Sequence, residues 1–136
     1  MAAFTPAPEP VADPAPRASV LLACADPAAL ARFYGDLLPV VPQPGLSASH
    51  WRLPLPGGGL LELYAPSRRR PLPPAGGRMA LGLRRIGDGQ TLAAWLRDAS
   101  ALGAALEEGP RQEPFGWEAW LRDPEGNRVL LLVVPG

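Results

Sequence analysis

The feature that most constrains the fold is a repeated order of predicted elements along the 136-residue chain. In each half, a short apolar segment of strand length, 19–25 in the first half, is followed by a helix-forming segment and then by strand-like segments. A shift of 68 residues places Gly58 on Gly126 and Leu61 on Val129, so turn and strand positions coincide although identity is slight. Such repetition predicts two equivalent units that pack against each other.

The first half shows how these elements are recognised. Asp26 followed by Pro27 is typical of a helix start, with an N-cap and a proline in the first turn. Pro39 ends this helix, and segments 50–55 and 60–65 predict two strands around a Pro-Gly-Gly-Gly turn. The apolar stripe of the helix is formed by Leu30, Phe33, Tyr34, Leu37 and Leu38.

The second half repeats this pattern behind a Pro- and Gly-rich connection. The elements expected there are a strand over 78–85, a helix over 90–102 and strands over 106–111, 117–122 and 128–134. Residues 1–16 are rich in proline and alanine, which predicts a disordered leader. The rest forms one domain over 17–135, with module one at 17–66, a linker at 67–77 and module two at 78–135.

Composition narrows the classes of function. Thirteen basic and thirteen acidic residues give a formal net charge of zero, which provides no long-range attraction for nucleic acid or an anionic membrane. No segment is apolar enough to span a bilayer, and no secretory signal is recognisable. The single cysteine, Cys24, cannot form an intramolecular disulfide. We therefore expect a cytoplasmic protein whose partner is a small molecule.

Two motifs carry a resemblance to a known family. The segment from Asp26 to Leu38 is similar to the D-x-x-x-A-x-x-F-Y-x-x-x-L passage of the vicinal oxygen chelate superfamily, which includes glyoxalases, bleomycin-resistance proteins and dioxygenases. The segment from Phe115 to Leu131 resembles the DPDGN turn and final strand of the same superfamily. The resemblance covers about Arg17 to Pro135 and implies an α+β fold of two βαβββ modules, forming a U-shaped mixed sheet around a cleft.

The resemblance also implies a place for a divalent metal ion, because metal-dependent relatives hold one with four strand residues. In this sequence, those positions fall on Ser19, Glu62, Arg78 and Leu130. Only Glu62 has a side chain that binds a divalent metal strongly, since a guanidinium has no acceptor and an alkyl chain has no donor atom. No metal site and no cofactor are therefore expected.

Strand alternation and the resemblance place seven residues in the ligand cleft. These are His50, Arg52, Glu62, Tyr64, Arg78, Glu118 and Trp120. Glu62 has three competing interpretations: a remnant metal ligand or general base, the partner of Arg78 in a buried ion pair, or a solvated side chain. The ion pair is preferred. His50 is either a donor to a ligand or a structural histidine, and Trp120 either an aromatic wall or core packing.

The leading hypothesis is metal-independent binding of a small, partly hydrophobic molecule, as in the drug-sequestering relatives. The alternatives are a metal-dependent lyase, isomerase or dioxygenase, for which a divalent metal would be needed, and a degenerate structural subunit. The sequence leaves open whether any reaction is catalysed. The resemblance favours a homodimer.

Overall fold

The computed structural model describes residues 18–67, 69, 71–74 and 78–136, so the predicted leader lies outside the described residues. The elements are β1 (Ser19–Ala23), α1 (Pro27–Leu37), β2 (Gln43–Pro44), β3 (His50–Pro54), β4 (Leu60–Tyr64), β5 (Leu81–Ile86), α2 (Gly89–Leu102), β6 (Ala105–Glu113), β7 (Gly116–Arg122) and β8 (Arg128–Val134). The repeated order of elements is confirmed.

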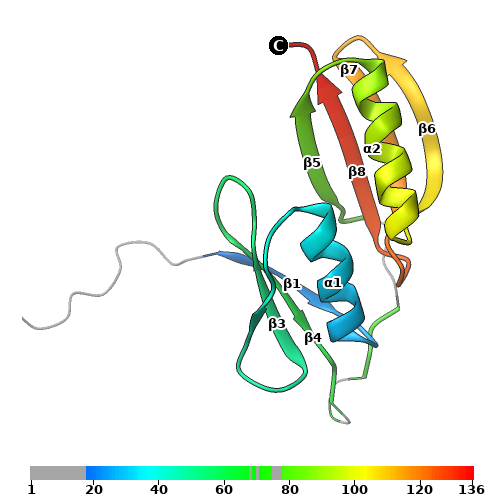
Figure 1. The fold of residues 1–136 in the computed structure, drawn as a ribbon. Helices are drawn as coiled ribbons and strands as arrows, with labels where there is room; N and C mark the ends of the chain where they lie inside the picture. The colour runs from blue at the N-terminus through cyan, green and yellow to red at the C-terminus, as the bar shows by residue number, and fades with distance from the viewer. Residues whose placement is uncertain (1–17, 68, 70, 75–77) are drawn as a thin grey trace, which may run out of the picture.

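Each module forms its own mixed sheet. The strand order is β1-β4-β3-β2 in the first sheet and β5-β8-β7-β6 in the second. In both sheets the first strand of the module pairs in parallel with its last strand, and the remaining pairs are antiparallel. Figure 1 shows the two modules one above the other, with α1 and α2 on the same side of their sheets. The predicted α+β fold of two βαβββ modules is confirmed.

The helices begin where the sequence predicts. The carboxylate of Asp26 accepts a hydrogen bond from the backbone N–H of Ala29 at 3.1 Å, which caps the start of α1. Helix α2 begins with a capping box, in which Asp88 and Thr91 each accept from the other's backbone N–H. Gly103 ends α2 in the left-handed conformation with φ 116°.

Two strand boundaries differ from prediction. The strand expected over 78–85 begins only at Leu81, because the proline- and glycine-rich connection extends further than the apolar pattern suggested. The short strand expected over 106–111 is the longer β6, which pairs with β7 through two register shifts. A bulged strand breaks the strict alternation of side chains, so its length is hard to predict from sequence.

The core lies between the helices and one face of each sheet. Alternate residues of the central strands are buried there, including Leu53, Leu61, Leu63, Ala119, Leu121, Leu131 and Val133. Phe33 and Tyr34 of α1 and Trp95 of α2 pack against them, and Cys24 is fully buried. The other face of each sheet is left open by the helices, and the predicted site residues of β3, β4 and β7 lie on that face.

The hairpin turn before β8 joins the two modules. Tyr34 donates its hydroxyl to the buried carboxylate of Asp123 at 2.7 Å. Glu125 accepts from the backbone N–H groups of Ala25 and Asp26 at 2.6 and 3.0 Å. The start of α1 is therefore held by side chains of module two. Among the described residues, no helix is long and apolar enough to cross a membrane.

Candidate ligand-binding site

A hydrogen-bonded cluster around Glu62 lies on the open face of the first sheet. One carboxylate oxygen accepts from the Ser19 hydroxyl at 2.6 Å. The other accepts from His50 Nε2 at 3.1 Å and from Arg52 Nε at 3.3 Å. Strand pairing explains the cluster. Arg52 of β3 lies directly opposite Glu62 of β4. On β1, Ser19 lies two residues before Leu21, which is the residue that pairs with Glu62. We call these four residues the Glu62 cluster.

The backbone fixes the role of His50 in this cluster. Its Nδ1 atom accepts a hydrogen bond from the backbone N–H of Leu46 at 2.8 Å. The neutral ring must then carry its proton on Nε2, which donates to Glu62. The side chain of His50 is only 12% exposed, so the ring is held in place rather than free to act on a ligand.

Glu62 is stabilised as an anion. The hydrogen bond from Ser19 holds the pKa of the carboxyl below its ordinary value, and the charge of Arg52 and the hydrogen bond from His50 add to this effect against the desolvation of the group. A carboxylate with a lowered pKa is a poor proton acceptor at neutral pH, which weighs against a general base. The predicted ion pair with Arg78 is wrong, because the ion pairs of Glu62 with described residues are those with His50 and Arg52.

The open face of the second sheet carries a cluster in which a cation is surrounded by carboxylates. Arg111 of β6 lies within 3.3 Å of carboxylate oxygens of Glu108 and Glu113, and Glu118 accepts from it at 3.0 Å. Beside this Arg111 cluster, the guanidinium of Arg128 lies over the Trp120 ring, 4.1 Å from its centroid. The Trp120 ring is therefore covered by a cation.

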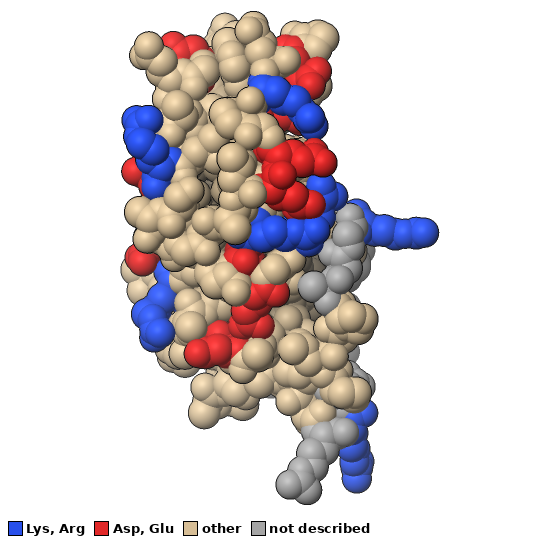
Figure 2. All heavy atoms as spheres, turned by 90° about the vertical axis from the view of Figure 1, so that its right-hand side faces the viewer, with Lys and Arg blue, Asp and Glu red and all other residues tan. Residues whose placement is uncertain are grey.

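In both clusters a central charged side chain is paired with side chains of the opposite sign. Figure 2 shows that, on one side of the molecule, acidic and basic side chains lie next to one another rather than in a large area of one sign. This surface accords with the formal net charge of zero.

Strand register decides which residues occupy the four expected metal positions. Glu62 lies opposite Leu21 in the first module, and Leu130 lies opposite Gly82 in the second. The position equivalent to Ser19, two residues before this pair, is therefore Ala80 in module two. The resemblance assigned this metal position to Arg78, which lies two residues earlier in the chain. The strand register corrects the assignment to Ala80.

This donor set does not fit a divalent metal ion. The four positions are held by Ser19, Glu62, Ala80 and Leu130. A methyl group and an alkyl chain supply no ligand atom, and the lone carboxylate already accepts three hydrogen bonds. Among the described residues, no group of three or more His, Cys, Asp or Glu side chains could hold a metal.

A cavity of about 580 Å³ lies where β1 faces the chain that leads into β5. We call it the inter-module cavity. Its lining is mainly apolar and includes Leu21 and Met79, whose residues are 64% and 81% exposed. Tyr64, Arg78 and Arg128 supply polar groups of its wall, together with Tyr34 and Asn127, whose side chains are hydrogen-bonded to Asp123. The volume is within the range typical of sites for small organic molecules.

The structure separates the seven predicted site residues into three groups. Tyr64 and Arg78 line the inter-module cavity. His50, Arg52 and Glu62 form the neighbouring cluster on the first sheet, whereas Glu118 and Trp120 lie on the second sheet with Arg111 and Arg128.

Sequence reasoning named only Tyr64 and Arg78 of the cavity wall and missed residues such as Leu21, Met79 and Arg128. Strand alternation could have found Leu21, because it shares a face with Ser19, and Arg128, because it shares one with Leu130. Met79 lies outside any strand, so no periodic signal marks it.

The fold agrees with comparisons to known proteins. The model of the glyoxalase-like domain family matches residues 19–132. No curated protein matches the chain. The structure is similar to a glyoxalase/bleomycin resistance protein/dioxygenase family enzyme from Burkholderia phytofirmans PsJN, with a TM-score of 0.71 and 18% identity over 85% of this chain and 96% of that one.

Two further solved structures have the same fold. Protein ATC0852 from Agrobacterium tumefaciens matches with a TM-score of 0.71 and 24% identity, covering 86% of this chain and 95% of that one. A glyoxalase/bleomycin resistance protein from Albidiferax ferrireducens T118 matches with a TM-score of 0.67 and 23% identity, covering 86% and 97%. Because the family model spans most of this sequence and the two modules match its fold, the chain belongs to the glyoxalase-like domain family.

Proposed function

We propose that the protein binds a small, partly hydrophobic molecule in the inter-module cavity and does so without a metal ion. The observation that carries this proposal is the apolar lining of a cavity of about 580 Å³, with Tyr64, Arg78 and Arg128 among its polar groups. Binding sites of this kind are mainly apolar, with a few placed polar groups that orient the ligand. Two arginines favour a ligand with an acceptor or anionic group at one end.

Metal independence rests on the donor set. Glu62 is held by three donors, and the positions equivalent to Ser19 and Glu62 in module two are Ala80 and Leu130. The Glu62 cluster then ties β1, β3 and β4 together beside the cavity, where the resemblance would place an ion. Its role in this proposal is to shape the wall that carries Tyr64.

A screen of planar aromatic compounds with and without a carboxylate group tests the proposal. Thermal shift and tryptophan fluorescence should report binding, since Trp120 lies beneath Arg128 of the cavity wall. Leu21→Arg should abolish binding by filling the cavity with a charged side chain, and Trp120→Ala should weaken the fluorescence response. Val41→Arg is the matched control, because Val41 is 72% exposed and lies outside the lining. Equal losses in the two arginine variants would contradict the proposal.

Metal analysis tests the second half of the proposal. Protein purified without a histidine tag or chelator should contain far less than one equivalent of iron, manganese, nickel or zinc. About one equivalent of any of these metals, lost in Glu62→Gln, would overturn metal independence and favour the metal-dependent enzyme.

We further propose that the protein is a cytoplasmic homodimer. The edges of β1 and β5 are unpaired within the described chain, and unpaired strand edges are a common place for two chains to associate. Light scattering during size-exclusion chromatography should give twice the monomer mass of 14.4 kDa. A monomer at that measurement would contradict the dimer and leave the cavity proposal unaffected.

A further inference from the structure

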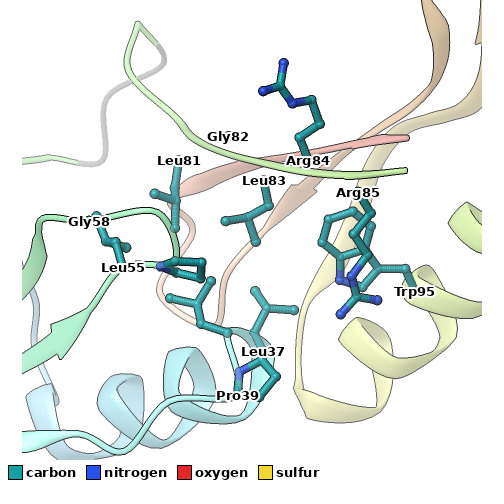
Figure 3. Close-up of a pocket in the computed structure, with 12 residues that line it drawn as sticks. Leu37, Pro39, Leu55, Gly58, Leu81, Gly82, Leu83, Arg84, Arg85 and Trp95 are labelled. Carbon is teal, nitrogen blue, oxygen red and sulfur yellow. The ribbon is translucent and has the colours of Figure 1, made fainter. Parts of the chain in front are cut away.

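A second cavity lies on the helix side of the molecule. Its volume is about 440 Å³, and its walls come from the end of α1, the turn after β3, strand β5 and helix α2. Figure 3 shows Leu37 and Pro39 on one wall, Leu55 on another, and Leu83 and Trp95 across from them. We call it the helix-side cavity. It shares only Leu81 with the lining of the inter-module cavity.

One wall of this cavity carries two hydrogen-bond donors that lack acceptors. Trp95 is 4% exposed, and its indole Nε1 is buried with no hydrogen-bond partner among the described residues. The guanidinium of Arg85 lies over the same ring, with Cζ 4.4 Å from the centroid. Arg85 forms no ion pair with a described residue, unlike Arg52, Arg111 and Arg122.

The side chains of this wall indicate which chemical group of a ligand would bind there. A guanidinium and an indole N–H are donors only, so neither can satisfy the other. A carboxylate has several lone pairs and binds a guanidinium with short, charge-assisted hydrogen bonds. An anion at this wall would therefore pair with the guanidinium of Arg85, which lies over the Trp95 ring.

The rest of the cavity suits the other end of such a ligand. Leu37, Pro39, Leu55 and Leu83 present aliphatic surface. No acidic residue belongs to the lining, so a carboxylate would meet no like charge there. Figure 3 shows the Arg84 side chain pointing away from Leu83 and Trp95, although its backbone is part of the wall.

We propose that the helix-side cavity binds a small amphipathic carboxylate, with its anionic group at Arg85 beside the Trp95 ring and its hydrocarbon part against Leu37, Leu55 and Leu83. This site lies on the opposite side of the sheets from the Glu62 cluster. It is independent of the ligand proposed for the inter-module cavity.

Titration with octanoate, monitored by NMR of the four tryptophan indole N–H signals, tests the proposal. The signal that disappears in Trp95→Phe identifies Trp95. Octanoate should shift this signal in a saturable way, and octan-1-ol, which has the same chain without the charge, should bind at least tenfold more weakly. Octanoate that leaves the Trp95 signal unchanged, or octan-1-ol that binds equally well, would overturn the proposal.

Two neighbouring arginines provide the matched variants. Arg85→Ala should weaken octanoate binding at least tenfold, Arg85→Lys should restore part of it, and Arg84→Ala should leave it unchanged. Equal effects of Arg84→Ala and Arg85→Ala would show that the effect comes from net charge and would contradict the site. Leu21→Arg, which blocks the other cavity, should leave the response at Trp95 intact. Loss of that response in Leu21→Arg would place octanoate in the inter-module cavity and overturn this proposal.

Discussion

The last hairpin turn of each module closes with the same two backbone hydrogen bonds but differs in dihedral angles and side chains. In module one, Leu55 N–H donates to Gly59 at 2.9 Å and Gly58 N–H donates to Leu55 at 3.0 Å. In module two, 68 residues later, Asp123 N–H donates to Asn127 at 2.8 Å and Gly126 N–H donates to Asp123 at 2.9 Å. Three consecutive glycines, Gly57 to Gly59, have positive φ in the first turn, whereas only Gly126 does in the second. The fold thus uses the same hydrogen bonds twice on different side chains.

The side chains of the second turn accept hydrogen bonds, which those of the first turn cannot do. Asp123 accepts from the backbone N–H groups of Glu125 and Asn127 at 2.8 and 2.9 Å, and from the Tyr34 hydroxyl. Leu55 and its neighbouring glycines have no side-chain acceptor at all. These contacts between the modules therefore use acceptor side chains of the second turn and donors of module one.

The open faces of the two sheets differ in a related way. On the first sheet, an anion, Glu62, is surrounded by donors from β1 and β3. On the second sheet, a cation, Arg111, is surrounded by the carboxylates of Glu108, Glu113 and Glu118. The Glu62 side chain is 16% exposed and the Arg111 side chain 47% exposed. The two modules have the same strand order but carry opposite charge patterns, and the central charged group is less exposed in the first.

The largest effect is expected from Asp123→Asn. The carboxylate is 4% exposed, and an amide would leave at least one of its donors without an acceptor. We expect a loss of about 3 kcal/mol in the free energy of unfolding, because hydrogen bonds to buried charged groups are the costly ones to break. Urea denaturation measures this value. A loss below about 1 kcal/mol would contradict the claim that this turn holds the modules together.

The pH dependence of stability in Tyr34→Phe tests the same contact. Burial, followed by the charge of Asp123, raises the pKa of the Tyr34 hydroxyl above its ordinary value of 10.0. Because the folded-state pKa is the higher one, the stabilisation is complete below about pH 10 and is lost as the pH rises above it. The wild type should therefore lose stability at alkaline pH more steeply than Tyr34→Phe. Cys24, whose pKa burial raises to about 12, is present in both proteins and cancels in the comparison.

The sequence predicted the fold better than the site, and particular residues show why. The helix stripe from Leu30 to Leu38 and the Gly58 and Gly126 turns are local patterns, and all of them lie where they were expected. The partner of Glu62 depended on where β5 begins. A start at Leu81 rather than residue 78 leaves Arg78 outside the strand, and the β3–β4 register places Arg52 opposite Glu62.

The contacts between the modules could not be predicted from the sequence for a different reason. Tyr34 fits the apolar stripe of α1, and nothing in its spacing indicates a hydrogen bond to a residue 89 positions away. Likewise, the acceptor role of His50 Nδ1 depends on the loop that brings the N–H of Leu46 to it. Side-chain chemistry at long sequence separation follows from packing, which periodicity does not describe.

Glu62→Gln tests the difference between the two open faces. The amide can accept with one atom only, so Ser19 or the pair of His50 and Arg52 loses its acceptor. We expect a loss of about 1.5 kcal/mol in the free energy of unfolding. Arg111→Gln, the matched change in the other cluster, should leave the urea midpoint almost unchanged because that cluster is exposed to solvent. Equal losses would mean that both clusters contribute alike.

Glu125→Gln tests the second contact from the turn. Its carboxylate accepts from Ala25 and Asp26 through separate oxygens, and the amide nitrogen of glutamine would face one of these N–H groups. We expect a loss of about 1 kcal/mol, measured by urea denaturation. Asp98→Asn is the control for removing one negative charge, since Asp98 is exposed on α2. A similar loss in the control would assign the effect to net charge rather than to the contact.

A small effect is expected from the two turn glycines. Gly58 and Gly126 have φ values of 115° and 87°, and a Cβ atom at either would meet no atom within 4 Å. Each Gly→Ala change should therefore cost only the backbone strain of a positive φ, about 1 kcal/mol. Because both turns close with the same two hydrogen bonds, the two losses should be similar and should add in the double variant. A much larger loss at Gly126 would show that the side chains of the second turn depend on this glycine.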